Sequence, residues 1–111
     1  MDNTLNISHN KTLLNNNELS LFAQTSNRNA HGAPFDSATI NAVWEKGEKE
    51  FLYFTFKRDV FRKVIAKNDF GKKTEYGWEI DHIIPLSQGG TDDLDNLQPL
   101  HWETIHSKGK Q

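Results

Sequence analysis

One strand-like stretch, Trp78 to Pro85 (WEIDHIIP), constrains the fold of this chain more than any other. Its aromatic and β-branched residues are typical of a buried strand, and the proline would end that strand. Two adjacent ionisable residues, Asp81 and His82, lie at the centre of the run. Because burying an unpaired charge is costly, the pair either satisfies neighbouring polar groups or is kept there for chemistry.

Composition excludes several classes of protein. A formal net charge of −2 over 111 residues rules out a globally basic nucleic-acid binder, so any such contact needs a local patch. The chain has no cysteine, which excludes disulfides and thiolate zinc sites and fits a reducing, cytoplasmic location. No apolar run approaches membrane-spanning length, so we expect no membrane contact.

The composition of the chain changes at about residue 32. Residues 1–32 are rich in Asn, Ser and Thr, and they bury too little apolar surface to offset the entropy of ordering. We expect a disordered or loosely ordered, flexible N-terminal arm there, in which Glu18–Ala23 could form a short helix if another part of the protein covers it. Aromatic and β-branched residues become frequent afterwards, which predicts one folded domain over residues 33–111.

Local signals predict helices and strands within the folded part. Asp36 or Ser37 would cap a helix that ends before Gly47, because apolar residues recur there at helical spacing. Val60–Ala66 is typical of either a strand or a short helix. The other predicted elements are strands at Phe51–Phe56, Trp78–Ile84 and Leu97–Leu100, a turn at Lys67–Gly71, a loop through Gly89-Gly90 and a final helix beginning near His101.

The last third of the chain contains six spaced motifs. They are Asp81-His82-Ile83-Ile84-Pro85, Gly89-Gly90, Asn96-Leu97, Pro99-Leu100, Trp102 and Lys108-Gly109. This order and spacing resembles the HNH endonuclease family, whose active unit is the ββα-metal or His-Me finger. The stretches YGWEIDHI and NLQPLHWE look most like small bacterial and phage members, and the resemblance covers residues 76–110.

The resemblance implies an α+β fold, with a ββα-metal core preceded by a helix and strands. It also implies a metal-dependent endonuclease that acts on DNA, double-stranded ahead of single-stranded.

The chemistry of hydrolysis agrees with the resemblance on the central pair. Cleaving a phosphodiester needs a water activated near neutral pH and a cation on the scissile phosphate. Histidine suits the first task and a carboxylate the second, so we expect His82 to be the general base and Asp81 a metal ligand. Neighbours on a regular strand point to opposite faces, so both reach one phosphate only where the strand distorts or ends. By resemblance, Asn96 is a further catalytic-site residue that ties the loop to the backbone and helps to orient His82.

The final predicted helix departs from the family pattern. The family has a metal ligand, Asn or His, nine residues after its central asparagine, and here that position is Ile105. His106 lies about 100° around the helix and His101 about one turn back, so neither replaces the ligand without a shift in register. One divalent ion, Mg²⁺ before Mn²⁺, Ni²⁺ or Zn²⁺, would then be held weakly by Asp81. The alternative is a catalytically impaired HNH-fold module that binds nucleic acid or another partner.

A basic segment precedes the motifs. Residues 57–73 contain seven basic and two acidic residues, a net charge of +5 in a chain whose total is negative. Such a segment is either a solvated face or a patch that grips phosphates without reading bases, and beside the motifs we favour the patch. The loop residues Asp92, Asp93 and Asp95 are assigned to capping and solvation. The expected nucleic-acid contacts are Arg58, Arg62, Lys63, Lys72, Lys73, Lys108 and Lys110.

Overall fold

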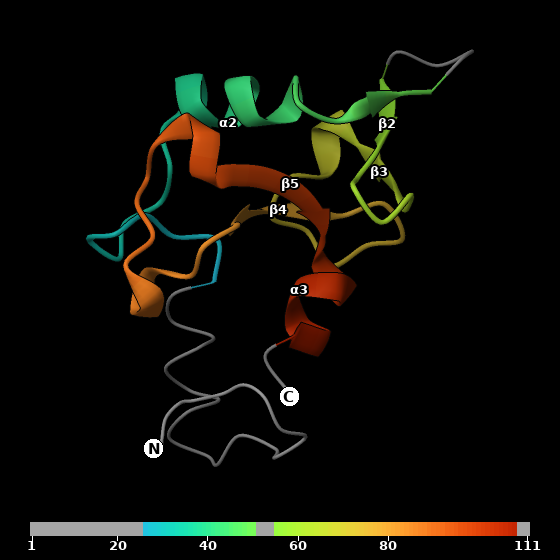
Figure 1. Ribbon diagram of the computed structural model, residues 1–111. Coiled ribbons are helices and arrows are strands. Elements are labelled where there is room, and N and C mark those ends of the chain that lie inside the picture. Colours follow the sequence, from blue (N-terminus) through green and yellow to red (C-terminus); the bar gives the residue numbers. More distant parts are fainter. Residues whose placement is uncertain (1–25, 51–54, 109–111) are drawn as a thin grey trace.

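Two small antiparallel sheets and two α-helices form the part of the chain that the structure, a computed structural model, describes: residues 26–50 and 55–108 (Figure 1). Three expectations fall outside this part: the first 25 residues of the expected arm, the short helix at Glu18–Ala23 within them, and Lys110. The fold class is α+β, as the sequence predicted. None of the described helices is long and apolar enough to cross a membrane.

Helix α2 runs from Ser37 to Trp44, where the helical spacing predicted it. Asp36 is its N-cap, with an extended backbone and a carboxylate that accepts a hydrogen bond from the N–H of Thr39 at 2.8 Å. Hydrogen bonds from the side chain and the backbone of Thr39 lower the pKa of Asp36. Val43 and Trp44 are buried, and this packing stabilises a helix too short to persist alone.

The first sheet has the order β1–β2–β3, with β1 at Glu48–Lys49, β2 at Phe56–Arg58 and β3 at Val64–Ala66. The segment for which strand and helix were both open therefore ends in a strand. Residues 51–54 of the predicted Phe51–Phe56 strand lie outside the described residues. The predicted turn after β3 contains one turn of 3₁₀ helix, Lys67–Asp69.

The side chain of Asp59 connects the first sheet to the second. Its buried carboxylate accepts hydrogen bonds from the backbone N–H groups of Phe61 and Lys63, each at 2.9 Å, in the turn between β2 and β3. It also accepts a hydrogen bond from the N–H of His101, again at 2.9 Å. One side chain thus attaches this hairpin to the part of the chain that carries the motifs.

The second sheet pairs β4, Trp78–His82, with β5, Leu97–His101. Strand β4 ends two residues before the predicted end at Ile84. Helix α3, Trp102–Lys108, follows β5 directly. The succession β4–β5–α3 is the two-strand-and-helix unit that the resemblance implies.

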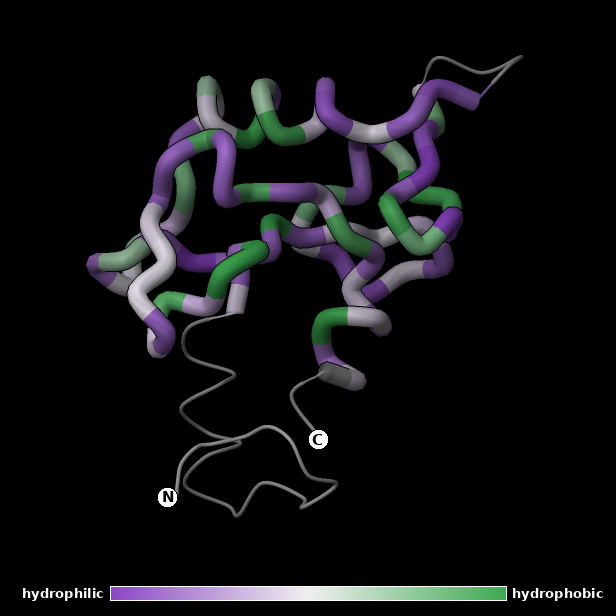
Figure 2. The backbone as a smooth tube through the Cα atoms, viewed as in Figure 1, coloured by the Kyte–Doolittle hydropathy of each residue, from purple (hydrophilic) through white to green (hydrophobic). Residues whose placement is uncertain are grey.

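The two faces of this second sheet have different neighbours. Helix α2 lies on one face and α3 on the other (Figure 1). Trp78, Ile80 and Leu97 form the core on the α2 face, where the rings of Trp44 and Trp78 are 5.3 Å apart. Figure 2 shows hydrophobic positions of α2 turned toward the sheet, whereas the segment around β1 is hydrophilic. Because side chains alternate along a strand, Asp81 belongs to the α3 face.

Candidate active site

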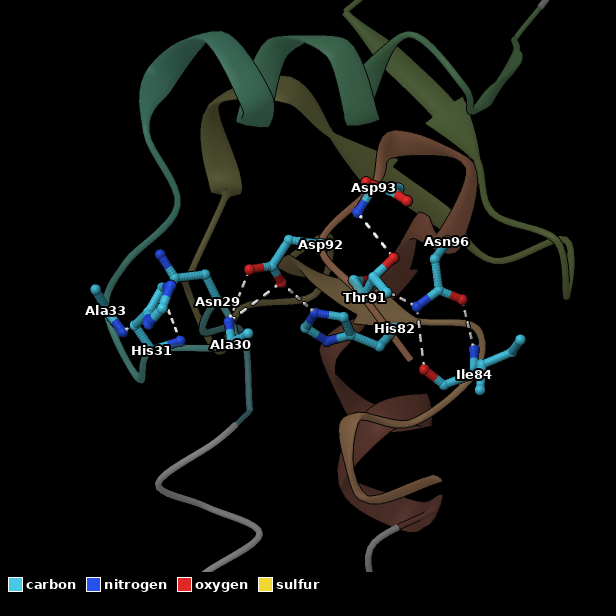
Figure 3. Close-up of polar contacts among 10 residues, drawn as sticks. All are labelled: Asn29, Ala30, His31, Ala33, His82, Ile84, Thr91, Asp92, Asp93 and Asn96. Carbon is cyan, nitrogen blue, oxygen red and sulfur yellow. Dashed lines mark hydrogen bonds and ion pairs between the residues drawn. The ribbon is translucent and has the colours of Figure 1, made fainter. Parts of the chain in front are cut away.

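His82 is the last residue of β4 and lies on the α2 face of the sheet. Its side chain is 10% exposed, and its Nε2 atom lies 2.9 Å from Oδ1 of Asp92 (Figure 3). The ring of Phe35 packs beside it at a centroid distance of 5.9 Å. An imidazole that keeps one nitrogen paired with a carboxylate has the arrangement of an oriented general base.

Asp92 is held in turn by the chain segment that precedes α2. The backbone N–H of Ala30 donates to both carboxylate oxygens, at 3.2 and 2.9 Å. Burial raises the pKa of Asp92, but hydrogen bonds from Ala30 and His82 and the charges of His82 and His31 outweigh it, so that the pKa lies below its ordinary value. Sequence reasoning missed this contact because it assigned Asp92 to capping and solvation. The available signal was weak: an acidic residue inside the loop between the two motif strands.

Asn96 closes that loop with its whole side chain. Its Oδ1 accepts from the N–H of Ile84 at 2.8 Å, and its Nδ2 donates to the carbonyl oxygens of Ile84 at 3.1 Å and Thr91 at 2.8 Å. Its own carbonyl oxygen accepts from the N–H of Ile83 at 2.8 Å. The tie to the backbone expected from the resemblance is therefore present, and it uses the combined donor and acceptor of the amide.

The two loop glycines serve different purposes. Gly89 has a φ of 91°, a left-handed conformation that glycine adopts without strain. Gly90 is required for space instead, because a Cβ there would lie 1.8 Å from the carbonyl oxygen of Ile84 and 2.9 Å from Nδ2 of Asn96. The close approach that lets Asn96 reach Ile84 thus depends on Gly90.

Asp81 lies apart from His82 across the strand. It is 8% exposed, and Nε2 of Gln98 donates to its Oδ2 at 3.0 Å. The pairing of Asp81 with Gln98 and of His82 with Leu97 is regular, so the two side chains belong to opposite faces of β4. The strand is not distorted between them, but it ends at His82. A phosphate could contact both groups only around that end.

The expected ligand position and the two histidines near it in the sequence do not fit the metal site that the resemblance implies. Ile105 is buried, 3% exposed, at the expected ligand position. Both ring nitrogens of His101 are engaged, Nε2 with the carbonyl oxygen of Glu75 at 2.6 Å and Nδ1 with the N–H of Glu103 at 3.1 Å. Nε2 of His106 lies 3.4 Å from a carboxylate oxygen of Glu79. Within residues 26–50 and 55–108, no group of three or more His, Cys, Asp or Glu residues could hold a metal ion.

Most of the expected nucleic-acid contacts have acidic partners. Arg58 pairs with Glu50 and Arg62 with Glu48. The Nζ atom of Lys63 lies 3.8 Å from Oε1 of Glu103. The Nζ atom of Lys73 lies 3.9 Å from Oε2 of Glu79 and 5.9 Å from the ring centre of Trp102. Lys72 has no ion-pair partner among the described residues, and Lys108 ends α3. The acidic partners come from outside residues 57–73, so counting charges within that segment overstated its positive charge.

Comparison with known proteins agrees with the location of this site. Residues 67–103 match the model of a family described as HNH endonuclease, a region that contains β4, β5, His82 and Asn96. A stretch of 36 residues is 47% identical to "Probable mobile endonuclease C" of Enterobacteria phage T4. That alignment covers 32% of this chain, and the chain spans only 17% of the length of the relative. No solved structure matches.

Proposed function

We propose that the chain is an HNH-type endonuclease that hydrolyses phosphodiester bonds in DNA, with double-stranded DNA as the first substrate to test, because residues 67–103 match the HNH endonuclease model. The family match supports a nuclease-type function in general. His82 is the general base of the proposal, and Asn96 fixes the loop beside it. Asp81 is the carboxylate that remains from the expected metal site.

One observation carries the proposal: an imidazole at the end of β4 with its Nε2 atom 2.9 Å from a carboxylate. Histidine exchanges its proton near neutral pH, which is the property that activation of a water requires. The loop that bears Asp92 is held by three hydrogen bonds of the Asn96 side chain. The base is therefore supported from two directions before any substrate arrives, which lowers the reorganisation needed for reaction.

The contribution of a cation is a separate part of the proposal. HNH nucleases generally use a divalent metal, and Mg²⁺ is the ion to test first, followed by Mn²⁺, Ni²⁺ and Zn²⁺. Because Ile105 offers no donor, Asp81 would bind the cation weakly. Cleavage would then be slow, because the cation is the group that would stabilise charge on the phosphate. For contact with the phosphate backbone, Lys72 is the first candidate, since four of the other basic side chains have to leave acidic partners: Arg58, Arg62, Lys63 and Lys73.

A second candidate function follows from the buried Ile105. A chain that keeps the fold but lacks a metal ligand could bind nucleic acid without cutting it. DNA binding that weakens steeply with salt, in the absence of nicking, would favour this function.

Nicking of supercoiled plasmid tests the leading proposal. We expect the wild-type chain to nick DNA with at least one of the four divalent ions, and not in EDTA. His82→Ala should lower the rate by about 10²- to 10⁴-fold, the usual contribution of a general base. Val60→Ala is the control, because it shortens a side chain that is 66% exposed in the turn between β2 and β3, outside the site. Equal nicking by wild type and His82→Ala would exclude His82 as the base.

A further inference from the structure

The residues just before Pro34 lie against the site rather than apart from it. We call residues 26–33 the strap. Oγ of Ser26 donates to Oε1 of Glu79 at 3.1 Å, and Oδ1 of Asn27 accepts from the backbone N–H of Ile80 at 2.8 Å. These two contacts attach the strap along β4, over residues that composition assigned to a loose arm.

Asn29 gives the strap a fixed turn. Its side-chain oxygen accepts from the N–H of His31 at 2.9 Å and of Ala33 at 3.0 Å. Two backbone hydrogen bonds, from Asn29 to Ala33 and from Gly32 back to Asn29, close the same turn. The N–H of Ala30 is left pointing away from this turn at the carboxylate of Asp92, as Figure 3 shows.

The chain of contacts therefore runs from Ala30 through Asp92 to His82. An ionised carboxylate can only accept hydrogen bonds, so the Nε2 atom of His82 has to be the donor. A neutral imidazole with its proton on Nε2 has its lone pair on Nδ1. No described residue hydrogen-bonds Nδ1. The geometry leaves Nδ1 as the basic atom.

We propose that the strap and Asp92 act as one positioning device, which selects the tautomer of His82 with the proton on Nε2 and the lone pair on Nδ1. In the proposed reaction, on which the catalytic part of this inference rests, a water proton passes to Nδ1 and the water oxygen forms the new bond to phosphorus. The ester P–O bond breaks, and the leaving oxygen takes a proton from solvent. Asp92 then faces the imidazolium that has formed. Asp92 and Ala30 are positioning residues, since neither touches the reacting atoms.

Asp92→Asn tests the device while preserving the shape of the side chain. An amide can present an N–H to Nε2 and so favour the other tautomer. We expect the nicking rate to fall by about 10- to 100-fold, as for other residues that orient a base or a ligand. Nitrogen NMR of the His82 ring should show Nε2–H in the wild type and a shift toward Nδ1–H in the variant.

Ala30→Pro tests the strap by removing the N–H that holds Asp92. We expect a smaller loss of nicking than in Asp92→Asn and a mixture of His82 tautomers. Ala30→Gly keeps the N–H, so its nicking rate and its tautomer should lie closer to those of the wild type than the rate and tautomer of Ala30→Pro do. Amide NMR spectra establish whether each variant is folded. If Ala30→Pro is unfolded, Asp92→Asn by itself tests the proposal.

The NMR measurement separates this inference from the proposed function. A wild-type chain that does not nick DNA, but whose His82 carries Nε2–H and changes in Asp92→Asn, would contradict the nuclease and support the device. A wild-type His82 with its proton on Nδ1 would overturn the device whatever the activity. An unchanged tautomer and an unchanged nicking rate in Asp92→Asn would overturn it as well.

Discussion

The two faces of β4 carry the two residues that the motifs single out, and their surroundings differ. On the α2 face, His82 is paired with Asp92, and Asp92 with the N–H of Ala30. On the α3 face, Asp81 has the amide of Gln98 nearby, and the expected ligand position is occupied by Ile105. One face has a connected polar network around an imidazole, and the other has a buried carboxylate and, at the expected ligand position, an aliphatic side chain.

The surroundings of His82 and those of Asp81 therefore depend on different parts of the fold. The surroundings of His82, which we call the base side, depend on the strap and on the loop that Asn96 closes, and both are held by several hydrogen bonds. On the α3 face, the expected ligand position is a single residue of α3, so one substitution there can remove a donor while the packing of the helix is preserved. The three predictions below test that contrast, from the largest expected effect to the smallest.

Gly90→Ala should cause the largest loss, on the base side. A Cβ 1.8 Å from the carbonyl oxygen of Ile84 forces the loop away and breaks the contacts of Asn96. We expect the free energy of unfolding to fall by about 3 kcal/mol, together with loss of nicking. Urea denaturation measures the first quantity. Gly89→Ala is the adjacent control, because its Cβ meets nothing within 4 Å and it adds only left-handed strain of about 1 kcal/mol. Equal losses in both variants would mean that the close approach is not what holds the loop.

Ile105→Asn should supply the missing metal donor near Asp81, the cation side of the proposed site, and should lower stability. Removing a buried aliphatic side chain and adding a polar group should lower the free energy of unfolding by about 3 kcal/mol. If position 105 is the missing ligand, Mg²⁺ or Mn²⁺ should raise the melting temperature and the nicking rate of this variant above those of the wild type. Ile105→Ala loses similar packing without gaining a donor, and should show neither effect. A metal response equal in both variants would show that coordination lies elsewhere.

The pH dependence of stability should show the smallest effect, again on the base side. The pKa of Asp92 is lowered in the fold, so its contribution to stability is present above its unfolded value of about 3.9 and is lost as the pH falls through the folded value. The difference in urea midpoint between wild type and Asp92→Asn should therefore shrink as the pH is lowered from about 6 toward 3. A difference that stays constant with pH would mean that the contacts of Asp92 do not depend on its charge.

Several elements could be predicted because their signals are local. The cap at Asp36 and the spacing of Val43 and Trp44 mark α2, and the apolar run before Pro85 marks β4. The end of β4 could not be located to the residue, because Ile83 and Ile84 are strand formers that here belong to the loop closed by Asn96. Charge counting along the basic segment could not include Glu48 and Glu103, because they approach the segment from other elements.

By itself, the sequence determined the resemblance to HNH endonucleases, the order of strands and helix, the candidate base His82 and the aliphatic residue at position 105, because each depends on neighbouring residues or on fixed spacings. Only the tertiary structure decided which carboxylate pairs with His82. Asp92 reaches His82 because Gly90 lets the loop close, and Ala30 reaches Asp92 from 62 positions earlier in the chain. Contacts between residues so far apart depend on the packing of whole elements, and no local pattern records them.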